Sequence, residues 1–139
     1  MGTYIPSGLR QEVYNRAGGR CEYCLIPETA VLVSHEVDHI IAQKHGGLTE
    51  SGNLALSCTV CNKYKGTDLA SLDPETGAVT PLFHPRRERW IDHFRLVGVE
   101  IVPLTATGRV TVRLLQLNHS DHIEDRNLLL TAGMLHLPE

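Results

Sequence analysis

A chain of 139 residues is short enough to fold as one small domain, and a composition of 42% hydrophobic and 21% charged residues is that of an ordinary soluble globule. The formal charge of −3 excludes a surface coated in positive charge for bulk nucleic-acid binding, so any such contact must come from local basic patches. The chain has no apolar run of about 18 residues and no apolar stretch typical of a signal peptide near its N-terminus. We therefore expect a cytoplasmic protein with no membrane partner.

The first half of the chain predicts one helix followed by a ββα unit. An apolar stripe predicts the helix, which we expect to be capped by Pro6-Ser7 and ended by Gly18-Gly19. Branched apolar residues predict the strands that follow. The expected elements, in chain order, are a helix over residues 7–17, β structure over 31–33 and 36–41, a returning strand over 53–57 and a helix over 59–65.

The second half predicts shorter elements of both kinds. They are a turn over 73–77, an extended piece over 78–83, a basic helix over 85–94, a strand over 99–102, an amphipathic segment over 109–117 and a helix over 121–134. The predicted fold class is α+β, with a small ββα core and an N-terminal helix in residues 1–67 and a mixed extension in residues 68–139. No low-complexity linker separates these parts, so we expect the extension to pack on the core as one domain.

Four cysteines form two CxxC pairs, Cys21 with Cys24 and Cys58 with Cys61, separated by 33 residues. In a reducing cytoplasm such pairs bind metal more often than they form disulfides. Four thiolates around zinc make a closed tetrahedral site that shapes the fold and does no chemistry. Four unrelated thiols would need two equal spacings by chance, and a redox CxxC would explain only one pair. The spacing therefore predicts a structural zinc ion.

Polar residues around the second cysteine pair indicate a reaction centre. The Asp38 carboxylate and the Asn62 carbonyl oxygen are hard ligands that suit magnesium or manganese, and His39 can take a proton from water near neutral pH. Neighbours on a regular strand point to opposite faces, so the strand must end or bulge at Asp38-His39 if both residues serve one site. Chemistry of this kind hydrolyses a phosphodiester bond.

Residues 36–66 also carry a recognisable spacing. Asp38-His39 is followed by Asn53, fourteen residues after the histidine, and then by Asn62, nine residues further on, inside CTVCNKYKG. This pattern resembles the HNH nucleases, whose ββα-metal unit has DH, then Asn, then His or Asn at these positions, often beside paired cysteines. The resemblance covers about residues 16–66, and Ala42 departs from it because the family usually has proline there.

The resemblance implies an HNH endonuclease that hydrolyses double-stranded DNA, by nicking or by cutting both strands. It implies that His39 is the general base and that Asp38 and Asn62 hold the catalytic magnesium or manganese ion. Asn53 would tie the loop by hydrogen bonds so that His39 is held in line. Whether the protein acts as a monomer or a homodimer is left open by the sequence.

Basic side chains near this unit are candidates for contact with DNA phosphates: Lys63, Lys65, Arg86 and Arg87. The two lysines could equally be a solvated helix face. The alternative function is a catalytically inert, zinc-stabilised module for DNA binding or protein interaction. Cleavage of plasmid DNA with magnesium or manganese distinguishes this alternative from the enzyme.

Overall fold

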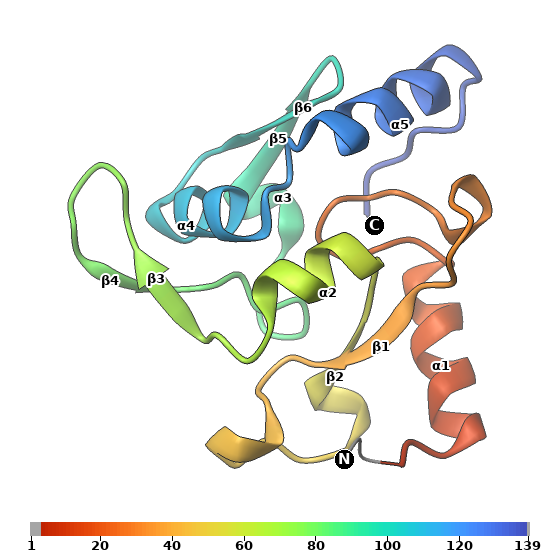
Figure 1. Cartoon of the computed structure of the whole chain (residues 1–139), viewed down its shortest axis with the longest axis vertical. Helices are drawn as coiled ribbons and strands as arrows, with labels where there is room; N and C mark the ends of the chain where they lie inside the picture. Colours follow the sequence, from red (N-terminus) through yellow and green to blue (C-terminus); the bar gives the residue numbers. More distant parts are fainter. Residues whose placement is uncertain (1–3, 139) are drawn as a thin grey trace.

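Five α-helices and three two-stranded antiparallel sheets make up residues 4–138, the part of the chain that the computed structural model describes (Figure 1). The α+β class is confirmed. The helices are α1 (Ser7–Ala17), α2 (Thr59–Lys65), α3 (Trp90–His93), α4 (Ala106–Leu115) and α5 (Ser120–Thr131). The strands are β1 (Glu36–His39), β2 (Leu54–Ser57), β3 (Ala70–Leu72), β4 (Val79–Pro81), β5 (Phe94–Val97) and β6 (Glu100–Pro103). Within residues 4–138, no helix combines the length and apolar character needed to cross a bilayer.

The predicted ββα unit is confirmed as β1, β2 and α2. The two strands pair antiparallel with Val37 opposite Leu56 and His39 opposite Leu54, and α2 contacts β1. Figure 1 shows this hairpin lying between α2 and α1. The expected β structure over 31–33 is wrong: these residues form a bend with no partner strand, and Leu32 is fully exposed to solvent. Branched side chains do not make a strand where no neighbour completes the hydrogen bonds.

Helix α1 covers the other face of the hairpin. Its Val13 is fully buried in a cluster with Leu54 and Leu56 of β2. Gly18 ends the helix in the left-handed conformation at φ 64°, where glycine carries no steric penalty. The predicted cap needs one correction, because Ser7 is the first helical residue and no side chain caps the helix N-terminus.

The expected helix over 85–94 is also wrong. Residues 85–87 form a turn in which the backbone amides of Arg86 and Arg87 each donate to the ring nitrogen Nδ1 of His84 at 3.2 Å. The chain is extended at Arg89, so that only the single-turn helix α3 follows, and Phe94 already begins β5. Strand β5 forms where the end of this helix was expected, because β6 pairs with it. Strand β6 itself was predicted.

The β3–β4 hairpin is held to α4 by an ion pair at its turn. The Arg109 guanidinium donates to both carboxylate oxygens of Asp73, at 2.9 and 2.8 Å. This bidentate geometry is the strong form of a charge-assisted hydrogen bond. The hydrogen bonds from Arg109 hold the pKa of the Asp73 carboxyl well below its usual range. The predicted turn over 73–77 is therefore confirmed, with a tertiary partner that the sequence did not show.

The extension and the ββα unit share one hydrophobic cluster. It contains all four cysteines together with side chains from β5, β6 and α4, among them Phe94, Ile101 and Val110. The indole N–H of Trp90 donates to the carbonyl oxygen of Tyr23 at 3.0 Å, which joins α3 to the first cysteine pair. Helices α2 and α4 also pack against each other. The first cysteine pair is thus enclosed by residues that lie far along the chain.

Arg126 of α5 is fully buried and acts as a hydrogen-bonding centre for three segments. Its guanidinium donates to the carbonyl oxygens of Val99 at 2.7 Å, Leu117 at 2.7 Å and Cys24 at 3.3 Å, and to Oδ1 of Asn118 at 3.0 Å. These acceptors belong to the β5–β6 turn, the link between α4 and α5, and the first cysteine pair. A single side chain therefore connects the extension to the cysteine loop.

Replacing Arg126 by methionine is expected to lower the free energy of unfolding by about 3 kcal/mol or more, because several buried acceptors would be left without a donor. The measurement is equilibrium denaturation in urea. Arg113→Met is the matched control, since Arg113 is exposed on α4. Equal stability of the two variants would contradict the role given to Arg126.

Candidate active site and metal centre

The four cysteines converge on one point. The sulfur atoms of Cys21, Cys24, Cys58 and Cys61 all lie within 4.8 Å of one another, all four residues are buried, and no disulfide joins them. A tetrahedral zinc with Zn–S bonds of about 2.3 Å separates its sulfurs by about 3.8 Å. The sulfurs of Cys24 and Cys58 are 3.6 Å apart. The cysteines are therefore positioned for a zinc site.

Backbone and side-chain donors surround these sulfurs. The amide of Cys24 donates to the sulfur of Cys21 at 3.5 Å, and the amide of Cys61 donates to that of Cys58 at 3.4 Å, where Cys58 is the N-cap of α2. His122 of α5 places its Nε2 atom 3.7 Å from the sulfur of Cys58. Such contacts suit sulfurs that carry negative charge when bound to a metal. The sequence did not indicate His122, because it is separated from the cysteines by most of the extension.

Strand β1 and helix α2 face each other through two polar contacts. On β1, Glu36 and Asp38 lie on the same face because side chains alternate along a strand. On α2, Asn62 and Lys65 lie on the same face because they are three residues apart. The amide nitrogen of Asn62 donates to Glu36, and the ammonium group of Lys65 lies 2.9 Å from Oδ2 of Asp38. Asp38 and Asn62 therefore project from the two sides of one interface.

The Asp38–Lys65 pair is almost completely removed from water. The side chain of Lys65 is 2% exposed and that of Asp38 is 12% exposed. Burial raises the pKa of the Asp38 carboxyl, and the positive charge of Lys65 opposes this effect. The ammonium group also donates to the carbonyl oxygen of His39 at 3.2 Å. Lys65 thus holds the end of β1 against α2.

His39 is the last residue of β1, and its side chain has a different neighbour. Asp38 and His39 pair regularly with Ala55 and Leu54, so the strand ends here without a bulge. The ring nitrogen Nε2 of His39 lies 2.8 Å from the hydroxyl oxygen of Thr49 in the loop between the strands. This contact orients the imidazole.

Asn53 closes the loop that connects the two strands. Its side-chain oxygen accepts from the amide of Ile41 at 2.9 Å, and its side-chain nitrogen donates to the carbonyl oxygens of Ile41 at 3.0 Å and Leu48 at 2.8 Å. Its own carbonyl oxygen accepts from the amide of Ile40 at 2.9 Å. A Cβ atom at Gly47 would lie 1.7 Å from the carbonyl oxygen of Ile41, so only glycine fits beside this network.

The four basic residues that we predicted to contact DNA phosphates have different environments. Lys63 and Arg87 are exposed. The prediction for Lys65 needs correction, because its ammonium group is buried against Asp38 and cannot reach a phosphate outside. Arg86 is largely buried and forms an ion pair with Glu22. Position in the sequence alone could not distinguish an exposed lysine from one that is buried against a facing strand.

Two residues in this region were not predicted to belong to the site. Glu36 was not among the predicted site residues, and the structure shows that it accepts a hydrogen bond from Asn62. The alternation of strand side chains could have indicated it, because Glu36 precedes Asp38 by two residues. Thr49 carried no signal, since its contact with His39 depends on the path of the loop.

Removing zinc is expected to unfold the ββα unit, because the cluster joins a loop before β1 to the start of α2. The measurement is the zinc content by native mass spectrometry together with the far-UV circular dichroism before and after chelation. Cys58→Ser should bind less than one zinc per chain and melt at a lower temperature, whereas the buried but non-cluster Ser57→Ala should retain the metal. Native protein without zinc would contradict the assignment.

The comparison with known families agrees with this geometry. The family model described as HNH endonuclease matches residues 21–68, which contain both cysteine pairs, β1, β2 and α2. No curated protein and no solved structure gives a significant match to the chain. Residues 21–68, which contain the clustered cysteines and the ββα unit, therefore match an HNH endonuclease domain.

Proposed function

We propose that this protein is a metal-dependent endonuclease that hydrolyses phosphodiester bonds of double-stranded DNA. The observation that carries the proposal is the juxtaposition of Asp38 and Asn62 across the β1–α2 interface, with His39 at the end of the same strand. The family match supports a nuclease or a DNA-interacting function. The specific reaction is inferred from the chemistry of these three side chains.

Asp38 and Asn62 offer a donor set that fits magnesium or manganese. Lys65 contacts Oδ2 of Asp38, which leaves Oδ1 for a further ligand. The amide nitrogen of Asn62 is engaged by Glu36, so its carbonyl oxygen is directed elsewhere. Carboxylate and amide oxygens are hard ligands, in contrast to the thiolates of the zinc cluster. A divalent cation held by these oxygens would supply Lewis-acid stabilisation of charge on the scissile phosphate.

His39 is suited to take the proton from the attacking water. If the Nε2–H group donates to the hydroxyl oxygen of Thr49, the unprotonated nitrogen is Nδ1, and this atom is the acceptor for the water proton. The contact with Thr49 then has the role of the group that orients a general base. The hydrogen bonds of Asn53 hold the start and the end of the loop together and thereby hold Thr49 near His39.

One observation favours the alternative, a catalytically inert module. The ammonium group of Lys65 already compensates the charge of Asp38 at 2.9 Å, as a bound cation would do. In the enzyme, Asp38 would hold the cation in addition to its contact with Lys65. In the inert module, the lysine would replace the cation, and the ββα unit would only bind DNA or a protein partner. The cleavage assay decides between these two functions.

His39→Ala is expected to reduce the rate of plasmid cleavage with magnesium or manganese by about 10²-fold to 10⁴-fold, the usual contribution of a general base. The measurement is the conversion of supercoiled plasmid to nicked or linear forms on a gel. His136→Ala is the matched control, because His136 is exposed near the C-terminal end of the described residues. Equal cleavage by both variants, or no cleavage by the native protein with either metal, would favour the inert module.

Thr49→Val is expected to lower kcat by about 10-fold to 100-fold with little change in KM, because removal of an orienting hydrogen bond leaves the groups that bind the substrate in place. Thr49→Ser retains the hydroxyl and should restore most of the rate. The measurement is steady-state cleavage of a labelled duplex, with the melting temperature recorded for each variant. A Val variant as active as the native protein would remove Thr49 from the mechanism.

A further inference from the structure

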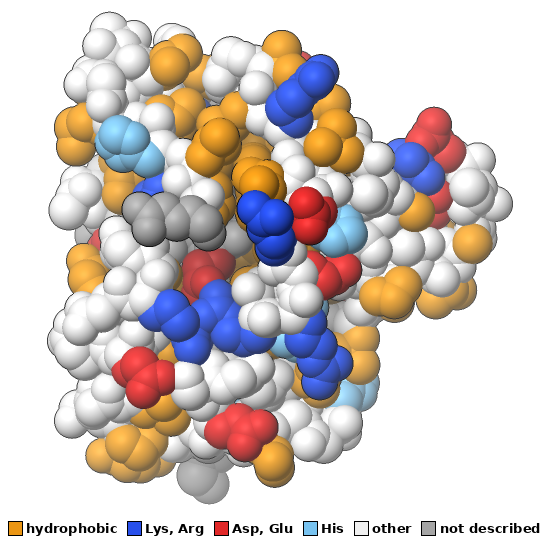
Figure 2. All heavy atoms as spheres, turned by 180° about the vertical axis from the view of Figure 1, so that it is seen from behind, with side chains coloured by type: hydrophobic (Ala, Val, Ile, Leu, Met, Phe, Trp, Pro, Cys, Tyr) orange, Lys and Arg blue, Asp and Glu red, His pale blue; other side chains and the backbone are white. Residues whose placement is uncertain are grey.

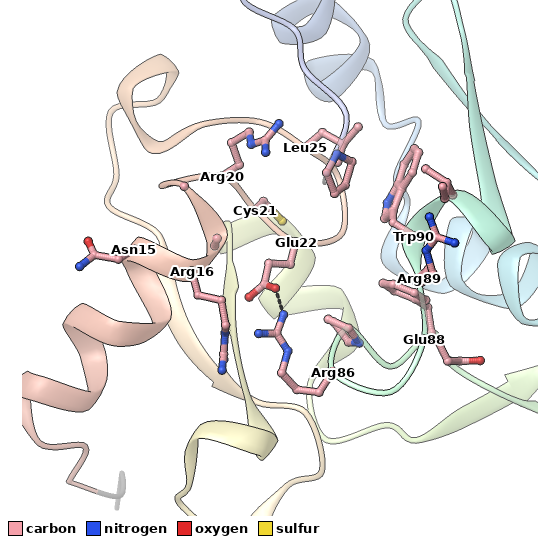
Figure 3. Close-up of a pocket in the computed structure, with 16 residues that line it drawn as sticks. Asn15, Arg16, Arg20, Cys21, Glu22, Leu25, Arg86, Glu88, Arg89 and Trp90 are labelled. Atoms are coloured by element: carbon pink, nitrogen blue, oxygen red, sulfur yellow. Dashed lines mark hydrogen bonds and ion pairs between the residues drawn. The ribbon is translucent and has the colours of Figure 1, made fainter.

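A groove of about 670 Å³ lies on the α1 side of the molecule, between that helix and residues 85–91 (Figure 3). Its size is in the range of about 300–1,000 Å³ that is usual for ligand sites. Figure 2 shows basic side chains gathered across the face that is turned away from the viewer in Figure 1. The proposed function uses none of the residues in this groove.

The charged lining of the groove is mainly arginine. It comprises four arginines and two glutamates: Arg16, Arg20, Arg86, Arg89, Glu22 and Glu88. The formal charge of the lining is therefore +2, in a protein whose overall charge is −3. Such a local excess in an acidic protein indicates an anionic ligand.

The two glutamates do not neutralise the groove evenly. Glu22 pairs with Arg86. Glu88 instead lies 3.0 Å from the ring nitrogen Nε2 of His93 and accepts from the amide of His84 at 2.8 Å. Arg89 is exposed and has no ion-pair partner within residues 4–138. Among the described residues, no carboxylate competes with an anion for its guanidinium.

Figure 3 shows the Arg86 side chain pointing at Glu22, with the end of the Arg16 side chain beside it. Burial and the positive charge of Arg16 lower the pKa of the Arg86 guanidinium to about 10. The Nε atom of Arg86 is also buried without a hydrogen-bond partner among the described residues. Glu22 pairs with Arg86 alone, and Arg16 lies 4.0 Å from the carboxylate of Glu12 on its own helix. Two guanidinium groups that repel each other would gain from an additional negative charge between them.

We propose that this groove binds backbone phosphates of the DNA whose cleavage is proposed above, outside the β1–α2 site. Arginine suits this role because its planar fork donates two parallel hydrogen bonds to phosphate oxygens. The apolar part of the lining includes the exposed Ile91, which can lie against a sugar between the phosphates. The inference rests on the proposed DNA-cleaving function and gives it a second binding surface.

The groove is coupled to the candidate active site through Arg16. Its guanidinium donates to the hydroxyl oxygen of Ser51 and to the carbonyl oxygen of Leu54, both at 2.8 Å. These two residues flank Asn53, which closes the loop after His39. DNA phosphates in the groove would therefore lie against the residues that hold this loop, on the opposite side of the hairpin from Asp38 and Asn62.

The test is DNA binding in the His39→Ala background without added magnesium or manganese, so that binding is measured separately from cleavage. Fluorescence anisotropy of a labelled duplex gives Kd at several salt concentrations. Arg86→Gln and Arg89→Gln should each raise Kd about tenfold. Each variant should also lower the slope of log Kd against log salt concentration by about 0.9 for each phosphate that it no longer neutralises. Arg113→Gln, which removes an exposed arginine of α4, should change neither quantity.

The melting temperature of each variant separates a direct effect on DNA binding from misfolding. Arg86→Gln breaks the pair with Glu22 and can destabilise the fold, whereas the exposed Arg89 can be replaced without this effect. If Arg89→Gln and a folded Arg86→Gln bind DNA as tightly as Arg113→Gln, the groove is not a phosphate site and the proposed nuclease function stands. If the parent protein binds no duplex at low salt, the groove proposal and the proposed function both fail.

Discussion

The convergence of four cysteine sulfurs is the constraint on which the rest of the structure depends. It joins the loop after α1 to the first turn of α2 and so closes the hairpin that lies between them. A zinc ion held by these sulfurs would fix both ends of this hairpin, whereas the short β1–β2 pair alone would be marginally stable. The extension then encloses the cluster, with His122 beside the sulfur of Cys58 and Arg126 bonded to the carbonyl oxygen of Cys24.

Once α2 is fixed, its polar face must lie against β1. Two contacts result: an exposed one between Asn62 and Glu36, and a nearly buried one between Lys65 and Asp38. The buried Lys65 stabilises the charged form of Asp38 before any cation is bound, and the same ammonium group would compete with a cation for the carboxylate. The proposed catalytic function therefore depends on whether Lys65 and a cation can both contact Asp38.

The two faces of the hairpin have different chemistry. The α2 face carries oxygen donors and little positive charge apart from Lys65, which suits a divalent cation. The α1 side carries the arginine-lined groove, which suits phosphate. Two residues connect these sides at the start of β2. Arg16 donates a hydrogen bond to the carbonyl oxygen of Leu54, and Asn53 closes the adjoining loop. The proposed nuclease function needs both properties: a site for the reaction and a surface that binds the DNA polyanion.

The sequence by itself determined the ββα order, the clustering of the four cysteines and the spacing of Asp38, His39, Asn53 and Asn62. These features depend on local periodicity and on residue types that repeat at short intervals. The sequence did not determine which polar residues become buried. The pairing of Lys65 with Asp38 depends on the packing of α2 against β1. The contact of Thr49 with His39 depends on the path of the loop between the strands. The absence of a strand over 31–33 and the formation of β5 in place of a longer helix had the same cause. Strand pairing requires a partner that only the tertiary structure supplies.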